Sequence, residues 1–162
     1  RPDTREDLMR LGVHIGDFIA IDPQPEVMEN GYIVSRHLDD KAGAAVLLGA
    51  VKAVVENKVS LPVDCHPLFT ISEEVGSGAS SALHGDVAEM LTLDNGTTAP
   101  GQNSSEFGVT MCMADMSGPF DYHLTRYMIR LCQEFQIPYQ RDIFRYYRSD
   151  SAAAVEASIK GG

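Results

Sequence analysis

The sequence has little positive charge and no long apolar run. Its 162 residues include 13 Lys and Arg against 23 Asp and Glu, which gives a formal net charge of −10. Because no basic cluster opposes this charge, the chain lacks the positive field that attracts phosphate backbones or anionic lipids. No apolar stretch reaches the roughly 18 residues that cross a bilayer. We therefore expect neither nucleic acid nor a membrane as a partner.

Cysteine is also sparse. Cys65, Cys112 and Cys132 are odd in number and widely spaced, so they predict neither a disulfide framework nor a thiolate zinc site. Three isolated thiols of this kind are typical of a reducing compartment, and we expect a cytoplasmic protein.

Two common catalytic motifs are missing as well. Residues 76–79 (GSGA) lack the lysine of a phosphate-binding loop and predict only a tight turn. No serine lies in a Gly-x-Ser-x-Gly string, which argues against a serine nucleophile.

The hydrophobic pattern, with 44% hydrophobic and 22% charged residues, is that of a globular protein whose strands and helices alternate. Helices are expected at 4–11, 40–57 and 119–135, and strands at 17–22, 31–36, 63–72, 87–93, 107–114 and 139–146. The helix at 40–57 is rich in small and apolar residues, so we expect it to be deeply buried on a sheet. The polar stretch 96–106 is the expected long loop. This alternation predicts an α/β fold with a mixed or largely parallel sheet.

Acidic residues occur where the predicted elements begin or end. Asp39 and Asp40 precede the long helix, Glu73 and Glu74 follow one strand, and Asp94 follows the next. Sites in α/β sheets lie beyond the carboxyl ends of strands, and a two-metal site needs a carboxylate that spans ions about 3.5–4 Å apart. We therefore expect the carboxylates of Asp39, Glu74 and Asp94 to converge. Each cluster alone also fits a simpler interpretation, since acids at helix N-termini complement the helix dipole and acidic pairs on loops are solvated.

The strings around these acids resemble a metallopeptidase family. Residues 36–43 (RHLDDKAG) are similar to the metal-bridging segment of the tetrahedral (TET-type) aminopeptidases, the family of glutamyl and deblocking aminopeptidases. Residues 69–76 (FTISEEVG) are similar to the catalytic segment, in which a hydrophobic strand ends in two glutamates followed by Val-Gly. The resemblance continues through Asp94 to residues 148–152 (RSDSA), where the family has Gly-Thr-Asp-Ala, and residues 102–115 are most similar to an osmoprotectant-linked branch.

Carried over position by position, this resemblance implies a dinuclear metal centre. Asp39 corresponds to the ligand that bridges two divalent metal ions, zinc or cobalt, while Glu74 binds one ion and Asp94 the other. Glu73 corresponds to the general base. The implied reaction is hydrolysis of N-terminal residues from a peptide substrate.

The resemblance also implies the architecture. Residues 36–162 would be a partial catalytic domain, a three-layer α/β/α structure of the zinc-peptidase type with a mixed, largely parallel sheet. Residues 1–35 would be the remnant of a β-rich dimerisation or accessory domain. The parent protein is expected to be a homo-oligomer, a dodecamer by family resemblance.

The sequence departs from the family pattern in ways that bear on activity. Lys41 replaces an arginine, which keeps the charge but loses the planar fork, and Ser149 replaces a threonine. The family uses two further histidine ligands, and none of the five histidines here occupies their contexts: His14, His37, His66, His84 and His123.

We therefore expect a fragment that is inactive by itself. One alternative is a non-catalytic oligomerisation or structural sub-domain. Another is a glycosidase, whose carboxyls flank a sugar about 5–9.5 Å apart, a spacing for which the adjacent Glu73 and Glu74 are poorly arranged.

Overall fold

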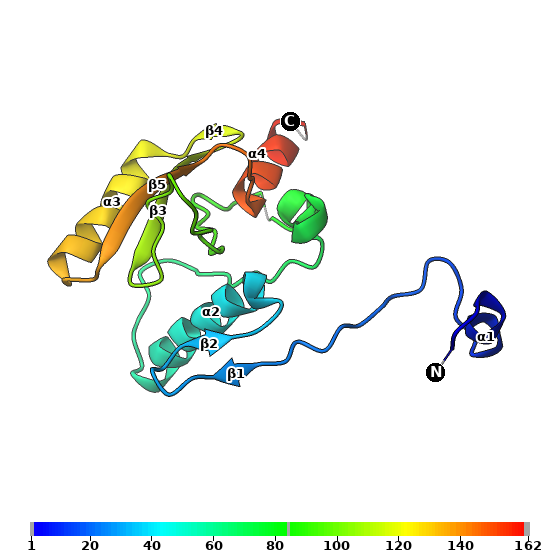
Figure 1. Ribbon diagram of the computed structural model, residues 1–162. Helices are drawn as coiled ribbons and strands as arrows, with labels where there is room; N and C mark the ends of the chain where they lie inside the picture. Colours follow the sequence, from blue (N-terminus) through cyan, green and yellow to red (C-terminus); the bar gives the residue numbers. More distant parts are fainter. Residues whose placement is uncertain (1, 84, 161–162) are drawn as a thin grey trace. The chain divides into compact units, whose positions relative to one another are not determined.

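The computed structural model describes residues 2–83 and 85–160 as a mixed α/β chain (Figure 1), so His84 lies outside the described residues. The elements in chain order are α1 (Arg5–Arg10), β1 (Glu26–Val27), β2 (Ile33–Val34), α2 (Leu38–Glu56), the 3-10 helices η1 (Glu73–Val75) and η2 (Gly78–Ser81), β3 (Val109–Asp115), β4 (Gly118–Pro119), α3 (Tyr122–Glu134), β5 (Tyr139–Phe144) and α4 (Asp150–Lys160). They form two compact units that divide between His37 and Leu38. Within the described residues, no helix combines the length and the apolar character needed to cross a membrane.

The first unit holds α1 and a short antiparallel ladder between β1 and β2. The Thr4 hydroxyl caps α1 by accepting the Asp7 N–H at 3.1 Å. Gly12, with a φ of +79°, takes the chain out of the helix in a conformation that costs glycine little. The predicted helix at 4–11 is thus confirmed.

The strand predictions for this unit are less successful. Residues 17–22 form no strand, and the strand expected at 31–36 is reduced to Ile33 and Val34. A strand exists only where a neighbouring segment completes its hydrogen bonds. The alternation in the sequence could not show that partner. That residues 1–35 derive from an accessory domain stays a prediction.

The long helix α2 is present, but it is far less buried than its composition predicts. None of its residues is buried, and Val46, Leu48 and Val55 each keep more than half of their surface exposed. A helix buries an apolar side only where another element packs on it. The expected deep burial is therefore wrong within the described residues.

The second unit contains a three-stranded mixed sheet in the order β4-β3-β5. Strand β3 runs parallel to β5 and antiparallel to β4. Helix α3 packs on this sheet (Figure 1), where Ile129 and Cys132 form a buried cluster with Met111 of β3. The strands predicted at 107–114 and 139–146 are thus confirmed.

Helix α3 begins later than the predicted start at residue 119. Pro119 lies instead in β4, where it pairs with Ala114 of β3. The Asp121 carboxylate then accepts the Leu124 N–H at 2.7 Å and caps the helix. A proline can open a helix, but here the cap residue two positions later sets the boundary.

Two further predicted strands, at 63–72 and 87–93, pair with no other strand among the described residues. Their apolar side chains are partly uncovered, and Ile71 is 98% exposed. These strand predictions are wrong here, because an apolar run forms a strand only beside a ladder partner. The alanine-rich helix α4 was not predicted, although alanine has the highest helix propensity and could have indicated it.

The predicted loop at 96–106 is confirmed, and a buried carboxylate organises it. Asp142, only 7% exposed, accepts hydrogen bonds on Oδ2 from Gln102, Asn103 and Ser104 at 2.8–3.0 Å. Burial alone would raise the pKa of Asp142, but hydrogen bonds from Ser104, Ile143 and Asn103 hold it below the usual range. The carboxylate thus ties the loop to β5.

Candidate metal centre

Three aspartates from two distant segments meet in the second unit. One carboxylate oxygen from each of Asp39, Asp40 and Asp94 lies within 4.8 Å of the other two. Asp39 and Asp94 are exposed, while Asp40 is half-buried. Carboxylates this close repel one another unless a proton or a cation neutralises part of their charge. Their oxygen donors suit a hard or borderline divalent cation.

The environment of this cluster raises the pKa of two of its members. The pKa of Asp94 rises to about 6, first through desolvation and then through repulsion by Asp39 and Asp40, although the Asn95 N–H opposes the shift. The pKa of Asp40 is raised by desolvation and by Asp39, against a hydrogen bond from the Gly43 N–H. Both shifts arise because burial and neighbouring negative charge disfavour the ionised carboxylate.

The backbone departs from helical geometry where α2 begins. Asp39 and Asp40 have non-helical angles there and are joined by a cis peptide bond. The Asp40 Oδ1 accepts the Gly43 N–H at 3.1 Å, as a helix cap does. Asp40 was not among the predicted metal ligands, and its proximity to Asp39 in sequence was the only signal for it.

The carboxyl group of Glu73 interacts electrostatically with this cluster. This half-buried group has a pKa raised to about 7, first by desolvation and then by repulsion from Asp94, Asp150, Glu74 and Asp39. A carboxyl with a pKa near neutrality can take up and release a proton under the conditions where most enzymes work.

The turn that carries Glu73 is built by glycine. Gly76 adopts a φ of +79°, and its N–H donates to the Glu73 carbonyl at 2.7 Å. The Ser77 N–H then donates to the Ser72 carbonyl at 3.1 Å. The tight turn predicted at residues 76–79 is confirmed, and the two consecutive glutamates lie just before it in η1.

The predicted site residues are therefore not all equivalent in the structure. The carboxylates of Asp39 and Asp94 lie close together, and the charges of both contribute to the raised pKa of Glu73. Glu74 is exposed and lies outside the group of mutually close oxygens. Within the described residues, that group consists of carboxylates alone and includes no histidine. His37, the histidine nearest to Asp39 in sequence, belongs to the first unit and has a left-handed φ of 64°.

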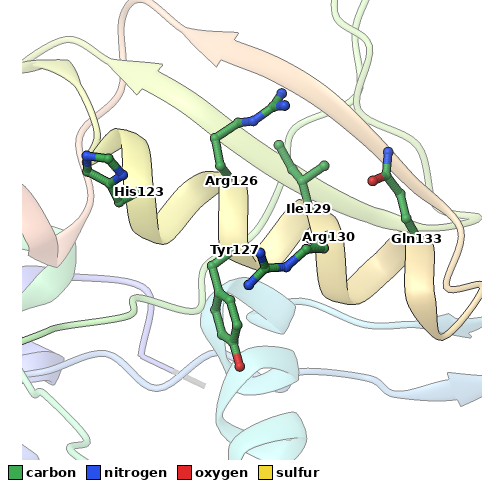
Figure 2. A pocket seen from close by; sticks show the side chains of 6 residues that line it. All are labelled: His123, Arg126, Tyr127, Ile129, Arg130 and Gln133. Atoms are coloured by element: carbon green, nitrogen blue, oxygen red, sulfur yellow. The ribbon is translucent and has the colours of Figure 1, made fainter.

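A separate cavity of about 430 Å³ lies on α3 (Figure 2). Its lining residues are His123, Arg126, Tyr127, Ile129, Arg130 and Gln133. The Arg130 guanidinium stacks 5.2 Å from the centre of the Tyr127 ring. With two arginines and no carboxylate, this cavity does not suit a divalent cation, and the acidic cluster remains the candidate centre.

Comparison with known sequences gives one consistent relationship. Residues 2–161 match a family described as M42 glutamyl aminopeptidase. Over 153 residues the chain is 38% identical to "Putative aminopeptidase YhfE" of Bacillus subtilis (strain 168), covering 94% of this chain and 44% of the relative. A 70-residue match, 26% identical, relates it to "Putative aminopeptidase SgcX" of Escherichia coli (strain K12), covering 43% of this chain and 18% of that protein. The chain thus spans less than half the length of these curated relatives.

A solved structure has a similar fold. It is the crystal structure of a TET aminopeptidase from the marine sediment archaeon Thaumarchaeota archaeon SCGC AB-539-E09. The TM-score is 0.61 at 21% identity, and the match covers 80% of this chain and 39% of that chain. The likeness concerns the fold, and it confirms the predicted mixed α/β class as an incomplete domain of this type.

Proposed function

The chain belongs to the M42 glutamyl aminopeptidase family, and on that premise we propose that it carries part of the active site of a metal-dependent aminopeptidase. The substrate class is peptides, from which the enzyme removes N-terminal residues. The observation that carries the proposal is the approach of Asp39 and Asp94, with Glu73 in electrostatic reach of both. This arrangement supports the proposal because one oxygen from each of the three aspartates could reach the same cation.

We assign the metal-binding role to Asp39, Glu74 and Asp94, which would hold two divalent ions, zinc or cobalt. The acidic cluster supports the assignment of Asp39 and Asp94, because their oxygens lie close enough together to share a cation, whose charge would offset their mutual repulsion. Bound ions of this kind polarise a carbonyl oxygen and lower the pKa of water. Asp40 supports the start of α2 through Gly43, so we assign it to the surroundings of the centre.

Glu73 is the proposed general base. Its carboxylate accepts a proton from the attacking water and later delivers that proton to the leaving amine. The pKa of about 7 supports this role, since a proton-transfer group works best when its pKa is near the working pH. Nearby positive charge would favour the ionised, proton-accepting form.

The donor set within this chain is partial, because the family pattern adds two histidine ligands in contexts that none of these histidines occupies. We therefore propose that the chain alone binds zinc weakly and turns over no substrate. The parent is proposed to be a homo-oligomer, by analogy with the tetrahedral aminopeptidases. The free thiols of Cys65, Cys112 and Cys132 support a cytoplasmic location.

A second candidate function is a non-catalytic sub-domain that serves an oligomer interface. The exposed apolar side chains of α2, such as Val46 and Val55, favour it, because exposed apolar surface of this kind marks interaction sites. This candidate predicts no metal binding by the acidic cluster, in this chain or in a longer polypeptide.

Metal content and peptidase assays separate the two candidates. Zinc bound after dialysis and hydrolysis of amino-acid p-nitroanilides are measured on this chain and on a longer polypeptide that contains the family's histidines. We expect weak zinc and no turnover for the chain, and two zinc ions with turnover for the longer polypeptide. A longer polypeptide without bound metal or turnover would contradict the aminopeptidase proposal.

A further inference from the structure

The start of α4 carries a buried carboxylate that the proposed reaction does not use. Asp150 is only 6% exposed, yet both of its oxygens have partners far away in sequence. Oδ2 accepts the Thr70 hydroxyl at 2.5 Å, and Oδ1 accepts the Ala79 N–H at 2.9 Å. Thr70 and Ala79 lie on either side of the Glu73–Glu74 turn. One side chain thus holds both ends of the segment that carries two proposed site residues.

The next residue makes the same kind of connection to the other half of the site. The hydroxyls of Ser151 and Thr92 are hydrogen-bonded at 2.5 Å. Thr92 precedes Asp94 by two residues. Consecutive side chains at one end of α4 therefore reach the Glu73–Glu74 turn and the Asp94 segment.

The packing around Asp150 is too close to be a loose surface contact. A Cβ atom added to Gly78 would lie 2.5 Å from the Asp150 Oδ1 and 2.9 Å from the Thr70 Cβ. Helix α4 lies beside η2, which contains Gly78 and Ala79 (Figure 1). Because Gly78 has no side chain, the Asp150 carboxylate can occupy this space.

The contact uses both oxygens of the carboxylate at position 150, which accept from the Thr70 hydroxyl and the Ala79 N–H together. Asparagine offers only one acceptor oxygen, so the Thr70 hydroxyl would have to reverse its role and accept from the asparagine NH₂ group, and the negative charge would be lost. A simple helix cap would instead direct its oxygen at the first N–H groups of its own helix.

We infer that Asp150 and Ser151 are positioning residues that set the spacing between the Glu73–Glu74 turn and Asp94. The inference rests on the proposed function, since this spacing matters only if those carboxylates act together. Mutation of residues that orient metal ligands without binding the metal themselves typically changes metal affinity by about 10–100-fold. Neither residue is expected to touch the metal or the substrate.

The first test is a zinc titration of the folded chain by calorimetry, at a temperature where circular dichroism shows every variant folded. Asp150→Asn should weaken zinc binding by about 10–100-fold. Ser151→Ala and Thr92→Val, which remove the second connection, should weaken it by a smaller factor. Wild-type affinity in folded Asp150→Asn and Ser151→Ala would overturn the inference.

A matched control separates positioning from general loss of stability. Asp142 is a buried carboxylate of the same unit with several hydrogen bonds, but it holds the loop at residues 102–104. Asp142→Asn should lower the unfolding midpoint and leave the zinc affinity unchanged. An equal loss of zinc affinity in Asp142→Asn would show that Asp150 acts through stability alone and would overturn the inference.

Amide hydrogen exchange on the metal-free chain provides a readout independent of zinc. Asp150→Asn should speed exchange at Ala79 and around the turn at 72–78, and Ser151→Ala should do so at 92–96. If Asp150→Asn does not fold, Thr70→Val replaces it, because it keeps the side-chain shape and removes only the hydroxyl. Unchanged exchange in both segments would overturn the inference. A wild-type chain that takes up no zinc would instead contradict the proposed metal centre, and exchange would then decide the positioning role.

Discussion

Asp39 and Asp94 lie on separate segments of the second unit, yet their carboxylate oxygens approach within 4.8 Å in a group that also includes Asp40. This approach is unfavourable for free carboxylates, and it becomes favourable when a cation sits among them. The stability of the metal-free chain and its affinity for zinc should therefore be coupled through the same side chains.

Removing one of these carboxylates should remove metal. Asp39→Asn and Asp94→Asn are expected to reduce zinc bound per chain, because each loses a charged oxygen donor. Equilibrium dialysis followed by elemental analysis measures this. Asp64→Asn, an exposed substitution in the same unit, is the control and should bind zinc like the wild type. Full zinc retention by Asp39→Asn would refute its role as a metal ligand.

Removing the base should leave the metal in place. In a longer polypeptide that is active, Glu73→Gln is expected to lower kcat by about 10²–10⁴-fold with unchanged zinc content, since it removes the proton acceptor but no ligand. Steady-state kinetics and elemental analysis on the same sample test both parts. Near-normal kcat in Glu73→Gln would mean that another group accepts the proton.

The metal-free chain should become less stable as the pH rises towards neutrality. The pKa of Glu73 is raised from 4.5 to about 7 in the folded state, so the folded chain binds its proton more tightly than the unfolded chain. The resulting stabilisation is complete below pH 4.5 and is lost as the pH rises to about 7. Without metal, Glu73→Gln should therefore raise the melting temperature at pH 7 by a few degrees relative to the wild type. At pH 4 the two proteins should melt at similar temperatures, and equal melting temperatures at pH 7 would contradict this coupling.

Asp142 should show the opposite pH dependence. Its pKa lies below the usual range in the folded chain, so its hydrogen bonds stabilise the fold above the unfolded pKa and weaken as the pH falls through the folded value. Asp142→Asn should flatten the acid limb of a stability-against-pH curve measured by urea unfolding. An unchanged acid limb would show that the loop at 96–106 does not depend on this charge.

Two glycine substitutions should change stability in opposite directions. Gly78→Ala places a methyl group 2.5 Å from Asp150, and overpacking of this kind costs about 1–3 kcal/mol. Gly49→Ala in α2 meets nothing within 4 Å, and replacing a helical glycine with alanine should stabilise the chain by about 0.5–1 kcal/mol. Urea midpoints compare the two, and a neutral Gly78→Ala would mean that Asp150 can move away.

Several local features could be predicted from the sequence because their interactions span only a few residues. The Thr4 cap of α1 joins positions three apart, and the Gly76 turn closes on Glu73. The strands β3 and β5 followed from their apolar patterns and from the helix between them. The acidic residues at the element boundaries were likewise visible as metal-ligand candidates.

Most contacts between distant segments could not be predicted from such local patterns. The approach of Asp39 to Asp94 was expected from their places at the element boundaries. The position of Glu74 outside their group and the hydrogen bonds from Thr70 and Ala79 to Asp150 depend on which segments pack together. The same holds for the exposure of α2 and for the absence of paired strands at 63–72 and 87–93 in the described chain. A sequence pattern shows which face of an element is apolar or charged. The partner of that face depends on the balance of packing and chain entropy over the whole fold, because a ladder or a buried contact is stable only when both sides are brought together.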